Sequence, residues 1–462
     1  MKKQYHFIHL TFQEYFAARH LLNLLKGSTS QQQAAVNFIN KYKYNARFHL
    51  LFVFASGLTS QSPYQLSIEP FWNTINSEPL DLIGLHHAKL IIECTNEIID
   101  TTVNPKYTTN IIQIAYWLQM CMHTESQERT ECLLQYFQRA KSIPNQTIIQ
   151  NTLIQLLSVD NLDEKKRAFR ILSLLNISEP IPELLRLLGC AISQQDSAIR
   201  DATYKTLEKI GQKAATKEII TALINELRLH GTDRRHGVWS AITKIVAKTT
   251  SLDVIDILIN ALNDTSSNIR QYACRILCNI EKLPVKKELI DAVLNTIHDH
   301  ENSVRAAACS TLGHIGRQSM YEEVIDALIN AVRDRDNHVH NEALKALGHI
   351  GEQSPTKQII DVLIDAPDRS RSHIFGNVFL SGPFLSRYYQ DVSLSALVTI
   401  GKKTSTNGVI ESLINTLFDL NSYSRIKACT ALAEISKEVV TQELLNALIN
   451  VLGDPKIGRA HV

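Results

Sequence analysis

The stretch that decides the fold of this chain is Leu328-Ile-Asn-Ala-Val332, which leads through a polar turn into Val339–Gly351. An apolar residue of this stretch recurs every 35 residues, at Ile224, Ile259, Leu294, Ile329 and Ile364. A second series keeps the same step, at Leu172, Leu207, Ile242, Leu277, Leu312 and Leu347. The step widens once, to 50 residues before Leu397, and returns to 35 before Leu432. A fixed period of this size is typical of a solenoid.

Each repeat has the pattern of two amphipathic helices joined by a turn. In one copy, helix A covers Glu323–Val332 and helix B covers Val339–Gly351, with apolar residues at helical spacing. The residues Asp334–Asn337 between them favour a turn and a helix N-cap. A two-helix unit of this length cannot bury both apolar faces alone, so it must stack on its neighbours. We therefore predict an all-α fold, an α-solenoid of helical hairpins.

The period also predicts where the hairpins lie. We expect repeats at residues 148–176, 183–211, 218–246, 253–281, 288–316, 323–351, 358–401 and 408–436, and a last helix at 443–454. Glycines at equivalent ends of helix B predict left-handed C-caps, at Gly211, Gly316, Gly351 and Gly401. The extra residues of the seventh repeat form an aromatic and basic insertion at about 366–388. This insertion is either a binding loop, an intron remnant or a disordered excursion.

Asp and Arg stand six residues apart at the start of helix B in three repeats: Asp264 and Arg270, Asp299 and Arg305, Asp419 and Arg425. Arg200 and Arg235 keep the Arg without the Asp, whereas His340 and Gln390 replace the Arg. The pattern resembles the HEAT repeat in its short-loop form. The resemblance implies that Asp and Arg pair along the stack as a ladder. The alternative is that these charges only solvate the turns.

The residues Phe7-Ile-His-Leu-Thr-Phe-Gln-Glu-Tyr-Phe-Ala-Ala18 form a specific motif. It resembles the winged-helix end of NACHT-type signal-transduction ATPases, the group of the NOD-like receptors. The resemblance implies that His9 reaches the β-phosphate of bound ADP. The alternative is a histidine at a helix start with a local backbone hydrogen bond, and we favour it for this chain.

The reason is that a nucleotide site is missing from the sequence. No Gly-x-x-x-x-Gly-Lys-Ser/Thr phosphate loop occurs, and the nearest string, Gly401-Lys-Lys-Thr404, follows a predicted helix B. We therefore expect a chain that starts after the ATPase core and holds no cofactor, with ATP or ADP bound in the full-length protein. Four segments follow: a winged-helix remnant at 1–26, a helical capping region at 27–147, the solenoid at 148–454, and a tail at 455–462.

Within the capping region we expect a linker at Lys26–Gln33, a helix ended by Gly57, and a loose loop containing Pro63 and Pro70. A further helix over Leu80–Glu97 again resembles the segment after the winged helix in NACHT proteins. The tail residues Ile457–Val462 break the repeat and match one reading frame of a sequencing adapter, so we interpret the tail as an artefact.

Composition excludes several function classes. The 48 basic and 46 acidic side chains nearly balance, so no strong attraction to nucleic acid or an anionic membrane is expected. No apolar run reaches the roughly 18–20 residues of a membrane span. The eight cysteines are thinly spread and no Cys/His set has zinc-finger spacing. We therefore expect no metal site, free thiols and a cytoplasmic protein.

Helix B offers two rows of polar residues on the predicted concave face. One row holds Lys209, Lys244, Asn279, His314 and His349, and the other holds Lys205, Ser240, Arg275, Ser310 and Lys345. These rows predict binding of an acidic partner, with a solvated helix face as the alternative. We expect a non-catalytic arm of a NACHT-type NTPase that binds a protein partner or the NACHT domain of its own chain. The alternatives are a free-standing HEAT adaptor and, as an enzyme, a HEAT-like bilin lyase.

Overall fold

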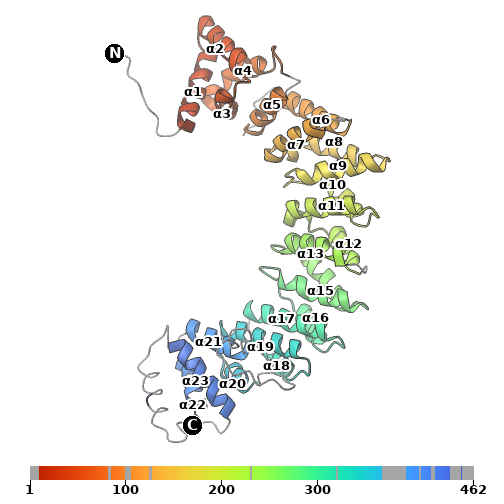
Figure 1. The fold of residues 1–462 in the computed structure, drawn as a ribbon, viewed down its shortest axis with the longest axis vertical. Helices are drawn as coiled ribbons and strands as arrows, with labels where there is room; N and C mark the ends of the chain where they lie inside the picture. The colour runs from red at the N-terminus through yellow and green to blue at the C-terminus, as the bar shows by residue number, and fades with distance from the viewer. Residues whose placement is uncertain are drawn as a thin grey trace, which may run out of the picture. The chain divides into compact units, whose positions relative to one another are not determined.

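The computed structural model describes residues 10–81, 85–98, 106–123, 127–228, 232–318, 321–366, 392–404, 407–417 and 422–436, together with Ile449. All regular structure within these ranges is helical, and none of it is a strand. Within each of the two units described below, Figure 1 shows neighbouring helices stacked one after another. The predicted all-α solenoid is confirmed.

The chain divides into two compact units. Unit 1 comprises residues 1–226 and 232–245, and unit 2 comprises residues 227–231 and 246–462. Ahead of the repeats, unit 1 contains α1 (Leu10–Leu25), α2 (Thr29–Tyr42), η1 (Ala46–Phe48), α3 (His49–Thr59), η2 (Ser62–Ser67), α4 (Ile68–Ile75), α5 (His86–Asn96), α6 (Tyr107–His123), α7 (Gln127–Arg139) and η3 (Ile143–Asn145). Large side chains such as Phe52, Phe71, Trp72 and Phe137 are fully buried among these helices.

Three expectations for this region are wrong. The predicted linker is mostly helix α2, because Ser28 and Gln31 form a capping box that starts the helix at Thr29. Helix α3 runs through Gly57, beside which the carbonyl of Glu97 lies 3.3 Å from where a Cβ would stand. The loop with two prolines is η2 and α4, because proline is tolerated in the first turn of a helix.

The repeats follow the 35-residue spacing closely. Unit 1 holds the A and B helices α8 (Thr147–Leu157) and α9 (Leu162–Leu174), α10 (Pro182–Ile192) and α11 (Ser197–Ile210), and α12 (Lys217–Glu226) and α13 (Thr232–Val246). Unit 2 holds α14 (Leu252–Leu262) and α15 (Ser267–Cys278), α16 (Lys287–Thr296) and α17 (Asn302–Gln318), α18 (Glu322–Ala331) and α19 (Asn337–Gly351), α20 (Lys357–Asp365) and α21 (Val392–Thr404), and α22 (Asn407–Thr416) and α23 (Ser422–Ser436).

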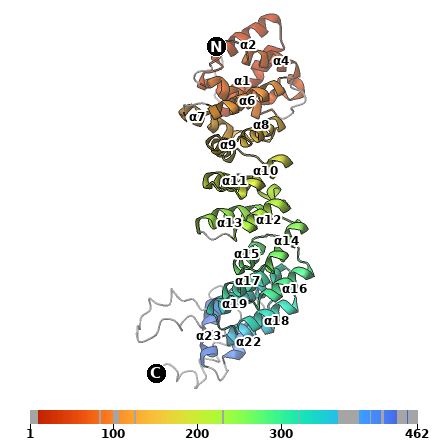
Figure 2. The same ribbon diagram turned by 90° about the vertical axis from the view of Figure 1, so that its right-hand side faces the viewer.

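In unit 2 the helices form two layers. Figure 2 shows α14, α16 and α18 on one side and α15, α17 and α19 on the other. Successive B helices contact each other more extensively than successive A helices do. The layer that packs more tightly lines the inner side of such a stack, which is the side that solenoids use for binding. The B layer is therefore the candidate binding side of unit 2.

Glycines explain the tight B layer, and three of the predicted caps are wrong. Gly316, Gly351 and Gly401 lie inside or at the last residue of their helices, and only Gly211 has a positive φ, of 63°. A Cβ on Gly316 would stand 2.5 Å from Cδ1 of Ile350 in the next B helix. These three glycines therefore lie against isoleucine side chains of the next B helix and do not supply a left-handed backbone.

Several expectations fall on residues outside the described ranges. They are the insertion at 366–388 except Ala366, the last helix at 443–454 except Ile449, and the tail at 455–462. Within the described part of the chain, no helix is both long and apolar enough to span a membrane.

Candidate protein interface

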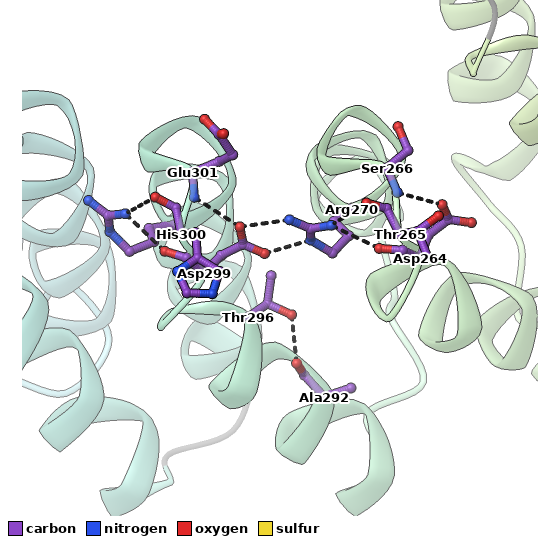
Figure 3. A network of polar contacts seen from close by, with 10 residues as sticks. Asp264, Thr265, Ser266, Arg270, Ala292, Thr296, Asp299, His300 and Glu301 are labelled. Carbon is purple, nitrogen blue, oxygen red and sulfur yellow. Dashed lines mark hydrogen bonds and ion pairs between the residues drawn. The ribbon is translucent and has the colours of Figure 1, made fainter.

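The Arg and Asp residues at the start of helix B link successive repeats in unit 2. Arg270 donates to both carboxylate oxygens of Asp299, at 2.6 and 2.8 Å, and to the carbonyl of Asp264 at 2.8 Å (Figure 3). Arg305 makes the same contacts one repeat later, with Asp334 at 2.8 and 3.1 Å and with the carbonyl of Asp299. Each guanidinium thus donates both to the inter-helix turn of its own repeat and to the aspartate in the turn of the next repeat.

The pairing differs in the repeats before Arg270 and after Arg305. Arg228 pairs with Asp264 at 2.6 Å, whereas His340, which stands in the Arg place, bonds the carbonyl of Val332 at 2.6 Å within its own repeat. Arg425 belongs to α23, but Asp419 lies outside the described residues. Among the described residues, Arg270 and Arg305 therefore link neighbouring repeats through Asp299 and Asp334.

In unit 1, the predicted binding lysines also contact the preceding repeat. Lys209 of α11 donates to the carbonyls of Ser173, at 2.6 Å, and Leu175, at the end of α9. Burial lowers the pKa of Lys209. Lys244 of α13 pairs with Glu208 of α11 at 2.7 Å. Lys209 and Lys244 therefore serve packing between repeats, while Lys205 is exposed on α11.

In unit 2, some of the predicted binding residues contact the preceding repeat and others lie on the surface. His314 bonds the carbonyl of Ile280 in the preceding repeat at 2.9 Å. Arg275 is exposed, and its guanidinium lies 5.8 Å from the ring centroid of Tyr272. Lys345 and His349 line one pocket on α19. We call the surface formed by the outward side chains of α15, α17, α19, α21 and α23 the B-helix face.

The pocket lies between α19 and α21 on the B-helix face and has a volume of about 190 Å³. Its walls are Lys345, Gly348, His349, Glu352, Val392, Ser395, Ala396 and Thr399. Glu352 pairs with Lys403 at 2.7 Å, and the Thr399 hydroxyl donates to the carbonyl of Ser395 at 2.8 Å. Desolvation lowers the pKa of His349, which keeps its imidazole neutral at pH 7. Lys345 is therefore the cation that the pocket presents to an incoming group.

The two layers of unit 2 carry opposite charge. The A helices hold ten carboxylates and two lysines: Asp253, Asp256, Glu288, Asp291, Glu322, Glu323, Asp326, Asp361, Asp365 and Glu411, with Lys287 and Lys357. The B helices hold nine cations and two carboxylates: Arg270, Arg275, Arg305, Arg317, Lys345, Lys402, Lys403, Arg425 and Lys427, with Glu342 and Glu434. An anionic segment is therefore repelled by the A layer. On the B layer, Arg270, Arg305 and Lys403 are paired with carboxylates and Lys427 is buried, so the attraction depends on exposed cations such as Arg317 and Lys345.

The N-terminal motif is described only in part, because His9 lies outside the described residues. The rest of the motif begins α1, where Phe12 and Phe16 are exposed by 60% and 47%. An apolar pocket of about 390 Å³ lies among α1, α2, η1 and α3, with Leu21 and Phe38 in its walls. No three His, Cys, Asp or Glu side chains in the described ranges gather as metal ligands would.

Comparison with known proteins supports the repeat class. The family of HEAT repeats matches residues 255–322 and 290–375. Among solved structures, the karyopherin Kap121p is 14% identical, with a TM-score of 0.46, and the match covers 97% of this chain. An engineered protein is 17% identical over 92% of this chain and 100% of its own, with a TM-score of 0.33. Kap95p is 8% identical over 96% of this chain and 63% of its own, with a TM-score of 0.38.

The chain spans 56% of the length of Kap121p. No curated protein sequence matches it. The chain is thus an α-solenoid whose residues 255–375 match HEAT repeats, and solenoids of stacked repeats commonly present extended binding surfaces.

Proposed function

We propose that this protein is a non-catalytic binding protein whose B-helix face in unit 2 holds a protein partner. The pocket between α19 and α21 carries the proposal, because it combines an exposed lysine, hydroxyl groups and apolar walls on the tightly packed layer. Rows of B-helix side chains that repeat along a solenoid suit an extended or helical segment. The opposite charge of the A layer directs such a segment to one side only.

Peptide display on the full chain tests this proposal. Random peptides selected against the wild type are measured again on Lys345→Glu, which alters the B-helix face, and on Asp361→Lys, which alters an exposed position of the A layer. We expect the selected peptides to lose binding to Lys345→Glu and to keep it with Asp361→Lys. Peptides that bind all three chains equally would contradict a binding surface on the B-helix face.

We further propose that the solenoid is the sensing arm of a NACHT-type signalling NTPase. The motif from Phe7 to Ala18 supports this context, with His9 as the residue that would contact ADP in such a protein. The test is the coding sequence upstream of Met1. A phosphate loop followed by an acidic Walker B segment in the same frame supports the NTPase, whereas a stop codon there favours a free-standing HEAT adaptor.

A cytoplasmic location belongs to the same proposal. None of the eight cysteines forms a disulfide, and burial raises the pKa of the Cys94, Cys274 and Cys309 thiols. Buried thiols with a raised pKa are inert, which fits a structural role in a reducing compartment. The alternative of a bilin lyase has no support from the family match, which is to a repeat class and not to a catalytic family.

A further inference from the structure

The B-helix face already binds one carboxylate of its own, between α17 and α19. Glu342 of α19 accepts a hydrogen bond from the hydroxyl of Ser310 in α17, at 2.8 Å, and pairs with Lys345 at 2.7 Å. Burial raises the pKa of Glu342, but the hydrogen bonds from Lys345 and Ser310 outweigh burial and lower it overall. Glu342 is therefore ionised at pH 7, held by donors from two successive repeats.

The next junction has the donors but not the carboxylate. The repeat step there is 50 residues, so Lys345 takes the place of Ser310, Ser395 that of Lys345, and Val392 that of Glu342. Val392 and Ser395 both line the pocket, together with Lys345 from the preceding B helix. The pocket thus stands where the preceding junction places the side chain of an acidic residue.

The remaining walls of the pocket suit a carboxylate as well. The ammonium of Lys345 has three N–H donors and its side chain is 50% exposed, so its bond to Glu342 leaves donors for a second acceptor. His349 and the hydroxyl of Ser395 add further donor groups. The acidic group in the wall, Glu352, is paired with Lys403 and adds little repulsion.

We propose that this pocket takes an Asp or Glu side chain from an acidic segment of a protein partner. The inference rests on the proposed function of the B-helix face and adds the chemistry of what is bound. The partner carboxylate lies between Lys345 and Ser395 as Glu342 lies between Ser310 and Lys345. The acidic A layer keeps the rest of the segment on the B-helix face.

A designed substitution tests the pocket directly. Val392→Glu supplies the missing carboxylate from the chain itself, at the first residue of α21, where a negative charge also favours the helix. Val392→Gln is the matched control, because the Gln side chain is nearly the same size as Glu and carries no charge. Binding is measured by fluorescence anisotropy on the full chain, with a labelled peptide of alternating Glu and Ser and with its Gln counterpart.

We expect the Glu peptide to bind the wild type, and Val392→Glu to weaken this binding about tenfold, the effect of one charge-assisted hydrogen bond. Val392→Gln and Lys287→Gln, which removes a lysine from the A layer, should each change the affinity less than about threefold. Equal weakening by Val392→Glu and Lys287→Gln would mean diffuse attraction and overturn the pocket.

Three other outcomes distinguish failure of this inference from failure of the proposed function on which it rests. If display yields peptides that depend on Lys345 but carry no acidic residues, the B-helix face binds a partner and the acidic segment is wrong. If the Glu and Gln peptides bind the wild type equally well, the carboxylate pocket is also wrong. If no peptide depends on Lys345, the proposed function itself fails.

Discussion

Gly313→Ala provides a sharp test of the packing between B helices. Gly313 lies within α17, and a Cβ at this position would stand 2.7 Å from the Cβ and 2.8 Å from the Cα of Ala346 in α19. Carbon atoms in contact normally lie about 3.5–4.0 Å apart, so the two helices must separate by roughly 1 Å. The Cα of Ala346 belongs to the backbone, so no side-chain rotation relieves the clash.

The magnitude follows from two opposing effects. Alanine favours a helix over glycine by about 1 kcal/mol. Overpacking a tightly packed site costs about 1–3 kcal/mol, and a backbone neighbour places Gly313 at the upper end. We therefore expect Gly313→Ala to reduce the free energy of unfolding by about 2 kcal/mol. Gly189→Ala is the matched control, because the nearest atom to its Cβ, Cγ1 of Ile219, lies 3.8 Å away.

The control substitution should stabilise the protein by about 1 kcal/mol. Urea unfolding followed by circular dichroism gives the overall change for both variants. Because repeat arrays often unfold in parts, native-state hydrogen exchange is needed to locate it. We expect faster exchange in α17 and α19 of Gly313→Ala. If both variants are stabilised by the same amount, the close approach of α17 and α19 is not real, and the explanation of the B layer fails.

Three further predictions address the ladder, a buried histidine and the nucleotide. Asp299→Asn should cost about 2 kcal/mol by urea unfolding, because Asp299 is 8% exposed and bonded by Arg270, whereas Asp256→Asn, at a surface pair with Lys286, should cost less than about 1. Burial lowers the pKa of His87 to about 4, so the folded protein favours the neutral imidazole. About 3 kcal/mol of stability should therefore be lost as the pH falls from 6.5 to 4. His87→Gln should flatten this pH dependence. Calorimetry with ATP or ADP should detect no binding to this chain, and micromolar affinity would contradict the interpretation of His9.

The stability that the ladder provides also depends on pH, but here the folded protein favours the charged form of Asp299, whereas it favours the neutral form of His87. Burial raises the pKa of Asp299, but hydrogen bonds from Arg270 and from the backbone N–H of Glu301 outweigh it, so the pKa is lowered overall. A lowered carboxylate pKa means that stability is present above the ordinary value of 3.8 and is lost as the pH falls below it. The ladder should therefore weaken only in strong acid, at lower pH than the loss due to His87.

The sequence predicted the repeats because their signal is long and redundant. Each helix boundary is supported by an apolar period that returns along the chain, so an error at one position changes little. The helices of the capping region lack such support. There, a single local interaction decides the outcome, as the capping box of Ser28 and Gln31 does for α2.

The site residues were harder to predict because the same residue type does different work in successive repeats. Lys209 and Lys345 are both exposed on B helices, yet Lys209 donates to a backbone carbonyl of α9 and Lys345 borders a pocket. The glycines were misread for a similar reason. Glycine at a helix end suits both a left-handed cap and a close helix contact, and only the position of the next helix distinguishes them.

In a regular array of repeats, a residue that departs from the repeat pattern is nevertheless informative. Equivalent positions in a solenoid have equivalent neighbours, so a residue that breaks the pattern changes one contact in a setting that is otherwise preserved. Where Glu342 gives way to Val392, the surrounding donors remain and a pocket opens beside them. The pocket opens to solvent between α19 and α21, so a group from outside the chain can enter it. We therefore infer that the partner, and not the chain, supplies the carboxylate at this junction.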